Sequence, residues 1–332
     1  MALPIPIDYA PMEAALRAEL PEGGGWIYEQ KWDGFRCLVF RDGAKVELRS
    51  KSGKSLGRYF PEVAEAIRSL EPTRFVLDGE MVVPVDGAFD FDQLLQRIHP
   101  AASRVKKLAA EFPAHLILFD LLVDTKGKDL THAPLKERGA ALETFAARYL
   151  ADHPTIRLSP ATTDLKVARR WLAGAHGDID GVMAKRADAP YATGERSAME
   201  KVKRVRTVDC VVGGFRWTKD GENVASLLLG LYDDEGKLHH VGFCSALNAK
   251  IRAEANARLI PLRGGSGFTG RAPGGPSRWR KEGTGAYEAL KPEVVVEVSY
   301  DHFTGGRFRH GTKFVRWRPD KAPRSCGMGQ VG

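Results

Sequence analysis

The chain changes character once, near Thr207, and this change constrains its fold more than any other feature. Before it, stretches with the two-residue alternation of strands are interspersed with stretches that repeat every three to four residues, as amphipathic helices do. After it, β-type runs dominate and a single helical stretch, 248–259, follows. At 332 residues the chain also exceeds the size at which one hydrophobic core usually stops growing. We therefore predict an α+β protein of two domains, residues 1–206 and residues 207–332.

In the first domain we expect antiparallel sheets and helices. Asp42-Gly43 predicts a hairpin turn, and we interpret Asp33-Gly34 as a second such turn. The predicted strands are 26–30, 35–41, 45–49, 75–84, 115–123, 155–158, 181–186 and 198–204. The predicted helices are 61–70, 91–98, 104–111, 134–150 and 164–175.

The second domain has the pattern of a small β-barrel. Five β runs and one helix favour a closed barrel, and the OB-fold is the most economical fold of that kind. The runs are 209–217, 225–232, 238–245, 293–300 and 313–317. Residues 263–285 are rich in Gly, Pro, Arg and Lys and predict a mobile loop, either a solvated insertion or a contact to a nucleic-acid backbone.

Composition excludes several classes of protein. No run of eighteen apolar residues is present, which argues against a transmembrane helix, and the N-terminal residues lack the pattern of a secretory signal. The four cysteines are widely scattered, so we expect buried thiols in a reducing cytoplasm and no zinc site. The formal net charge of +8 favours a polyanionic partner without identifying nucleic acid by itself.

The segment from Lys31 to Arg36 has the pattern Lys-x-Asp-Gly-x-Arg. A lysine amine is a nucleophile only when it is neutral, which requires desolvation or nearby cations that lower its pKa. The guanidinium of Arg36 adds positive potential and suits a polyanionic substrate. The pattern therefore suggests covalent chemistry at phosphorus with Lys31 as the attacking group.

Further motifs with charged or aromatic residues follow this segment along the chain. They are Ser50-Lys51-Ser52-Gly53, Asp78-Gly79-Glu80, Leu118-Phe119-Asp120, Asp180-Gly181-Val182-Met183-Ala184-Lys185, Met199-Glu200-Lys201-Val202-Lys203 and Arg318-Pro319-Asp320-Lys321. Together with the first motif, this series resembles the covalent nucleotidyltransferases, and specifically the ATP-dependent DNA ligases of the short bacterial type without extra domains. The resemblance covers nearly the whole chain.

The resemblance implies a role for each part of the nucleotide site. Lys31 would attack the α-phosphate of ATP and become a lysyl-adenylate. Glu29 would accept a hydrogen bond from the adenine exocyclic amine, Phe119 would stack on the base, and Arg36 would bind the ribose or a phosphate. Lys51, sharing the role with Arg49, would contact the nucleotide or the DNA 5′-phosphate. It stands where the family often has arginine, and it lacks the bidentate fork.

The resemblance also implies a metal site and a contribution from the second domain. Glu80 would contact the ribose and, with Asp180, hold Mg²⁺ or Mn²⁺; the family more often has glutamate at the position of Asp180. Alternation along a strand places Lys201 and Lys203 on one face, where they would contact the α-phosphate. Arg318, Asp320 and Lys321 would orient the pyrophosphate when the barrel closes over the nucleotide.

The implied activity is the sealing of nicks in double-stranded DNA, in DNA repair. We expect a monomer in the bacterial cytoplasm, at the nucleoid, with no membrane association, and a separately encoded repair polymerase as a possible partner. An RNA capping guanylyltransferase and an RNA ligase are alternative enzymes. A non-catalytic, basic OB module that binds nucleic acid is a third alternative, but it leaves the carboxylates Glu80 and Asp180 unexplained.

Overall fold

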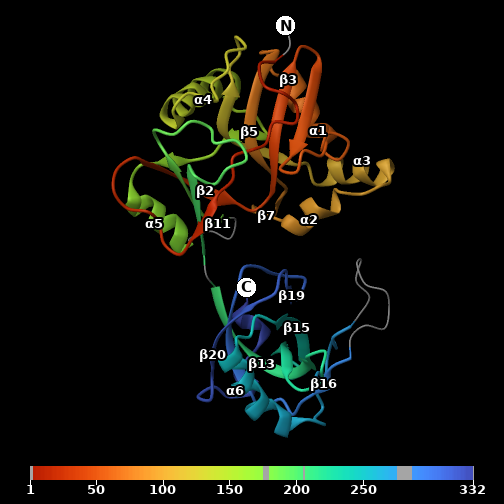
Figure 1. Cartoon of the computed structure of the whole chain (residues 1–332). Coiled ribbons are helices and arrows are strands. Elements are labelled where there is room, and N and C mark those ends of the chain that lie inside the picture. The colour runs from red at the N-terminus through yellow and green to blue at the C-terminus, as the bar shows by residue number, and fades with distance from the viewer. Residues whose placement is uncertain (1–2, 175–178, 205, 275–285, 332) are drawn as a thin grey trace. The chain divides into compact units, whose positions relative to one another are not determined.

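The computed structural model describes residues 3–174, 179–204, 206–274 and 286–331 (Figure 1). These residues form two compact units, Met1–Arg204 and Val205–Gly332. Both units combine helices with sheets in which most neighbouring strands are antiparallel. The predicted α+β class is confirmed.

One sheet of the first unit carries helices on one face. Its strands, in spatial order, are β4 (Lys45–Ser50), β3 (Phe35–Asp42), β5 (Arg74–Val82), β8 (His115–Val123) and β9 (Ile156–Leu158). The helices of this part of the chain are α1 (Pro61–Ser69), α2 (Phe91–Gln96), α3 (Ala102–Glu111) and α4 (Leu135–Tyr149). Val39, Leu77 and Leu118 point to the helices and share a core with Ile67 and Phe145. Because side chains alternate along a strand, the residues between them face away from the helices.

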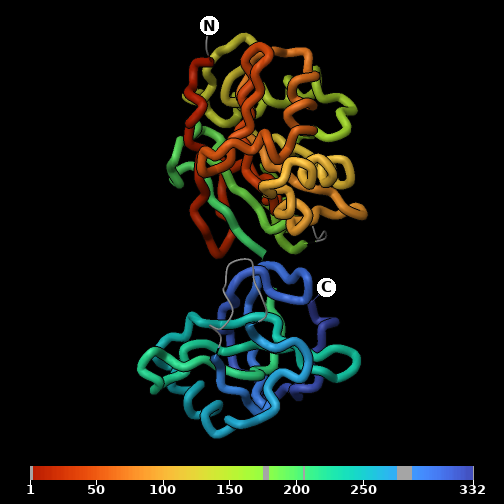
Figure 2. Tube along the Cα trace, turned by 90° about the vertical axis from the view of Figure 1, so that its right-hand side faces the viewer, coloured from red at the N-terminus to blue at the C-terminus, as the bar shows by residue number. Residues whose placement is uncertain are grey.

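The second sheet of this unit lies on that other side. Its strands are β1 (Ala15–Arg17), β12 (Met199–Lys203), β11 (Ile179–Arg186), β2 (Trp26–Trp32) and β10 (Ala161–Thr162), in that order. Helix α5 (Leu165–Ala173) covers one face, where Ala168 packs among Tyr28, Val182 and Val202. The N-terminal segment runs beside residues 193–202 (Figure 2), through the β1–β12 pair and a bridge from Met12 to Thr193.

The helices lie where the sequence predicts them, within the one or two residues by which helix ends commonly differ. Three of them begin directly after a residue whose side chain accepts a backbone N–H of the first turn, namely Asp90, Asp164 and Asn248. The sequence did not predict the short strands β1 and β10, nor the small hairpin of β6 (Pro84–Val85) and β7 (Ala88–Phe89).

The interpretation of Asp33-Gly34 as a hairpin turn was wrong. Strand β2 pairs with β10 and β11, whereas β3 pairs with β4 and β5, so the chain crosses from one sheet to the other at these two residues. A Cβ atom on Gly34 would lie 2.2 Å from the backbone oxygen of Met81. The glycine is therefore needed because the backbone of β5 approaches the crossing closely.

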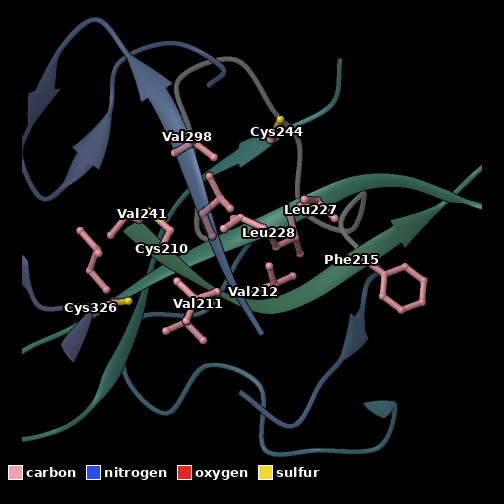
Figure 3. Close-up of a cluster of buried hydrophobic side chains, with 14 of the residues drawn as sticks. Cys210, Val211, Val212, Phe215, Leu227, Leu228, Val241, Cys244, Val298 and Cys326 are labelled. Atoms are coloured by element: carbon pink, nitrogen blue, oxygen red, sulfur yellow. The ribbon is translucent and has the colours of Figure 1, made fainter. Parts of the chain in front are cut away.

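The second unit is built around one six-stranded sheet. Its main order is β15 (Leu238–Cys244), β14 (Val224–Tyr232), β13 (Arg206–Trp217), β17 (Val295–Tyr300) and β20 (Lys313–Trp317), and β16 (Glu288–Ala289) also pairs with β13. A hairpin of β18 (Phe303–Thr304) and β19 (Arg307–Phe308) and helix α6 (Ala249–Leu259) complete it. Figure 3 shows its core, in which Val212, Phe215 and Leu228 are fully buried.

A fully closed barrel is not detected. Among the described residues, the end strands β15 and β20 meet only through an isolated bridge from Cys244 to Thr312. The predicted mobile loop lies partly outside the described residues, at 275–285. The part before it packs on the sheet at Phe268, which is buried. Its ring lies so close to Gly213 that a Cβ atom added to this glycine would be 2.7 Å from it. No helix formed by the described residues is both long and apolar enough to span a membrane.

Candidate active site

A pocket of about 160 Å³ opens between the two sheets of the first unit. Seven residues predicted from the sequence line it: Glu29, Lys31, Arg36, Lys51, Glu80, Phe119 and Lys201. Asp180 and Lys203 are not part of its lining, but both lie in an ion-pair chain with Lys31. The first sheet supplies Arg36, Glu80 and Phe119, and the second supplies Glu29, Lys31 and Lys201, so the pocket has two walls of different chemistry.

Lys31, Lys201, Lys203 and Asp180 form what we call the lysine cluster. The Nζ of Lys31 donates to Oδ2 of Asp180 at 2.5 Å, and the Nζ of Lys203 lies 3.3 Å from the same oxygen. Burial lowers the pKa of Lys201, and the positive charges of Lys31 and Lys203 lower it further. One carboxylate is thus shared by two amines in a strongly positive environment, which suits the binding of phosphates.

The backbone of β11 brings the lysine cluster together. Gly181 pairs with Lys31 on one neighbouring strand and with Lys203 on the other. It has φ = +151°, and a Cβ atom there would lie 2.1 Å from the backbone oxygen of Val202. The glycine after Asp180 therefore permits the bulge that brings the three strands into this register.

A second group, which we call the frame, consists of Arg36, Asp78, Asp120, Arg138 and Tyr191. Nε and Nη2 of Arg36 each donate to the Asp78 carboxylate at 2.5 Å. The hydroxyl of Tyr191 donates to Oδ2 of Asp78 at 2.6 Å and accepts from the backbone N–H of Met12 at 3.0 Å. Burial alone would lower the pKa of Arg36, but the adjacent Asp78 outweighs it and the pKa is raised.

The other half of the frame is a fully buried ion pair. Nε and Nη2 of Arg138 donate to the two oxygens of Asp120 at 2.8 and 2.9 Å. The Arg138 guanidinium also lies 5.6 Å from the centre of the Tyr191 ring. Buried charges are tolerated only when they are paired and hydrogen-bonded, so these contacts hold Arg36 in a rigid setting. The sequence did not predict site roles for four of these residues, namely Asp78, Asp120, Arg138 and Tyr191.

Phe119 and Glu29 lie at one end of the pocket. Cations flank the Phe119 ring, with Cζ of Arg36 at 4.7 Å and Nζ of Lys185 at 4.6 Å from its centre. Each oxygen of Glu29 lies 2.8 Å from Nζ of Lys185. Burial raises the pKa of Glu29, and the Lys185 charge opposes that effect. A carboxylate has about four acceptor positions, so Glu29 retains the capacity to accept from a further donor.

Lys185 itself was missed as a site residue. It ends the Asp180–Lys185 motif, but its partner Glu29 is 156 positions away in the sequence. A lysine with 2% of its surface exposed requires a counter-charge. That burial becomes visible only once β11 and β2 are paired.

Glu80 lies opposite Arg36 across the β3–β5 pair. Within the part of the chain that the structure describes, no Lys or Arg forms an ion pair with it. Burial raises its pKa to about 7, against the opposing charges of Arg36 and Lys31. A bound cation would favour the ionised carboxylate, and carboxylate oxygens such as those of Glu80 and Asp180 are the ligands that Mg²⁺ and Mn²⁺ prefer. These residues therefore fit a divalent metal.

Lys51 lies at the rim of the pocket. Its Nζ is 3.2 Å from Oε1 of Glu13, and 60% of its side chain is exposed. Arg49, which was expected to share this role, donates to the backbone oxygen of Gly53 at 3.1 Å and does not line the pocket. The structure therefore favours Lys51 over Arg49 for contact with a bound molecule.

In the second unit, the Arg318–Lys321 motif is assembled around Asp209, a residue that the sequence analysis did not assign to it. Nη1 of Arg318 donates to the Asp209 carboxylate at 2.8 and 3.0 Å, and Nζ of Lys321 lies 3.4 Å from it. Nη2 of Arg318 donates to Asp320 at 2.8 Å. That hydrogen bond is the main cause that lowers the pKa of Asp320 to about 2. The three predicted residues are thus brought together and already paired within their own unit.

Comparison with known proteins gives matches over both units. The model of the ATP dependent DNA ligase domain matches residues 10–203, and that of the ATP dependent DNA ligase C terminal region matches residues 220–321. The chain is 44% identical to DNA ligase C1 of Mycolicibacterium smegmatis and 42% identical to DNA ligase C of Mycobacterium tuberculosis, in each case over 100% of this chain and 96% of the relative.

Solved structures agree with these matches. The ligase domain of M. tuberculosis LigD has a TM-score of 0.50 and 28% identity, covering 96% of this chain and 98% of that chain. A mycobacterial DNA ligase D complexed with ATP and MES gives the same values.

Proposed function

Because this chain belongs to the ATP-dependent DNA ligases, we propose that it seals nicks in double-stranded DNA and that Lys31 carries AMP during the reaction. The observation that carries the proposal is the position of Lys31, which lines the pocket with Lys201 beside it and Phe119 also in the lining. We propose that residues 1–206 form the nucleotidyltransferase domain and residues 207–332 the OB-fold domain.

In the first step the Lys31 amine attacks the α-phosphate of ATP. A nitrogen–phosphorus bond forms, the bond to pyrophosphate breaks, and the lysine gives up its proton. Lys31 must therefore leave its ion pair with Asp180, which stabilises the protonated amine. Lys201 and Lys203 supply fixed positive charge for the negative charge that develops on the phosphate.

The nucleoside is held by residues of both sheets, Phe119 and Arg36 from the first and Glu29 from the second. Phe119 stacks on adenine, Glu29 accepts from its exocyclic amine, and Arg36 binds the ribose or a phosphate. The bidentate Arg36–Asp78 pair supports this assignment, because it fixes the guanidinium before ATP arrives. Glu80 and Asp180 would hold the divalent metal, which supplies charge neutralisation on the phosphates when bound.

Two further transfers complete the reaction. AMP passes from Lys31 to the 5′-phosphate at the nick, and the 3′-hydroxyl then attacks that phosphate and releases AMP. Lys51 is placed at the rim to contact the nucleotide or the 5′-phosphate. We assign Arg318, Asp320 and Lys321 to the pyrophosphate in the first step, which requires Arg318 and Lys321 to exchange Asp209 for the leaving group.

The setting in the cell is part of the same proposal. The net charge of +8 supports a polyanionic substrate. We propose that the protein acts as a monomer on nicked DNA in the cytoplasm, at the nucleoid, in DNA repair, and alongside a separately encoded polymerase.

The test is covalent labelling followed by sealing. The protein is incubated with magnesium and either ATP or GTP labelled at the α-phosphate, and the protein-bound label is measured. We expect label from ATP alone, and the labelled protein, freed of nucleotide, should seal a nicked duplex without added ATP. Label from GTP alone would indicate a capping enzyme, and no label would indicate a non-catalytic binding module.

A further inference from the structure

A second and larger cavity of about 610 Å³ adjoins the nucleotide pocket. Glu29 and Phe119 line both cavities, so the two cavities meet at these side chains. None of the roles assigned above uses the second cavity. It lies next to the residue that is proposed to bind the adenine exocyclic amine.

One wall of this cavity is a face of helix α4. Lys136, Gly139, Ala140 and Glu143 follow the three- and four-residue spacing that places side chains on one side of a helix. The chain from Leu158 to Thr163 forms another wall. Since Lys136, Ala140 and Glu143 are exposed, this part of the cavity opens to solvent.

The deeper part is apolar and large. Ile27, Leu135, Leu142 and Leu158 contribute hydrophobic side chains, and an apolar cavity of about 150 Å³ is known to accommodate benzene in another protein. Beside Gly139 the space is open, because a Cβ atom placed there meets no atom within 4 Å. The cavity therefore has room for an aromatic group.

We propose that this cavity accepts substituents on the exocyclic amine of adenine, so that monosubstituted ATP analogues adenylate the protein. The inference rests on the proposed function, which places that amine at Glu29. A singly substituted amine keeps one N–H for Glu29, and its substituent enters the second cavity. A doubly substituted amine has no N–H, so the hydrogen bond to Glu29 is lost and an apolar methyl group faces the buried Glu29–Lys185 ion pair instead, which is unfavourable.

The reaction is the same as with ATP. The bond between Nζ of Lys31 and the α-phosphorus forms, the bond to pyrophosphate breaks, and the proton of the lysine passes to water, so no other reactant is required. The site thereby distinguishes substrates by the number of N–H groups on the base and not by the size of the substituent.

The test uses ATP and an ATP analogue with a benzyl group on the exocyclic amine (benzyl-ATP). Adduct formation by the full chain with magnesium is followed by intact-protein mass and by rate. We expect an adduct with each nucleotide, and none with the analogue that carries two methyl groups on this amine. In the variant Gly139→Phe, whose side chain fills the cavity, the KM for benzyl-ATP should rise at least about tenfold while that for ATP stays unchanged.

Gly139→Ala is the matched control, because it adds one carbon and should leave both KM values unchanged. No adduct with benzyl-ATP beside a normal adduct with ATP would overturn the inference and leave the proposed function intact. An equal rise in the KM for both nucleotides in Gly139→Phe, or no rise in either KM, would also overturn it. Failure of ATP itself to form an adduct would overturn the proposed function together with this inference.

Discussion

The two walls of the nucleotide pocket hold their charges in different ways. In the frame, each guanidinium faces its own buried carboxylate and makes two hydrogen bonds to it. In the lysine cluster, two amines share one oxygen of Asp180, and Lys201 has a lowered pKa. An arginine keeps its charge under all ordinary conditions, whereas a lysine amine loses its proton when its surroundings favour it. The frame is therefore suited to hold the nucleotide, and the lysine cluster is suited to react with it.

The largest expected effect on stability comes from breaking the frame. Asp120→Ala leaves the buried Arg138 without its partner and should lower the free energy of unfolding by about 3–5 kcal/mol, measured by urea denaturation. The control is Asp188→Ala, which removes an exposed ion pair with Arg186 and should change the free energy of unfolding far less. Equal losses in the two variants would show that the frame is not a rigid element.

Glu80 predicts a pH dependence of stability. Its folded-state pKa is about 7, above its ordinary value of 4.5, so the folded protein binds the extra proton between these values. Stability of the protein without metal and nucleotide should therefore fall as the pH rises from about 5 to 8, by up to about 3 kcal/mol. Glu80→Gln has no such titration. A difference in unfolding free energy between wild type and Glu80→Gln that is constant with pH would contradict the prediction.

Removing the hydroxyl of Tyr191 tests whether the frame positions Arg36. Tyr191→Phe leaves Asp78 and the N–H of Met12 each one partner short and should cost about 1–3 kcal/mol of unfolding free energy. The KM for ATP in adenylation should rise several-fold with little change in kcat. Tyr28→Phe is the matched control, because its buried hydroxyl donates to Pro21, away from the pocket. The prediction is wrong if both variants change the KM equally.

The smallest expected effect on stability is in the lysine cluster. Lys203→Ala removes a partly exposed amine, and Asp180 stays paired with Lys31 in this variant. The free energy of unfolding should therefore change by less than about 1 kcal/mol. The rate of adenylation should nevertheless fall by about 10²-fold or more, because a fixed charge near the α-phosphate is lost. A large loss of stability with an unchanged rate would reverse the distinction between the two walls.

The sequence predicted the parts of the site that lie within short motifs. Periodicity placed Lys201 and Lys203 on one face of β12, and their pairing with Met183 and Gly181 of β11 agrees with it. The frame could not be predicted in this way. Tyr191 reaches Asp78 across 113 positions, and Lys185 reaches Glu29 across 156, so these contacts exist only after both sheets have formed.

Asp33-Gly34 shows a second limit of sequence reasoning. A hairpin turn and a crossing between two sheets can use the same residue types for different reasons: a tight turn needs the backbone freedom of glycine, whereas the crossing needs glycine at position 34 for space. What distinguishes them is the approach of Met81 to Gly34, which belongs to a strand almost fifty positions later. The choice between the two structures was therefore not encoded locally.

Peptide mapping by mass spectrometry can show whether Lys31 is the residue that carries the adenylate. The protein is incubated with ATP and magnesium, digested, and searched for AMP on every lysine. We expect one AMP on the peptide that contains Lys31, and none on any peptide of Lys31→Arg, which keeps the charge beside Asp180. AMP on Lys201 or Lys203, or AMP that persists in Lys31→Arg, would contradict it.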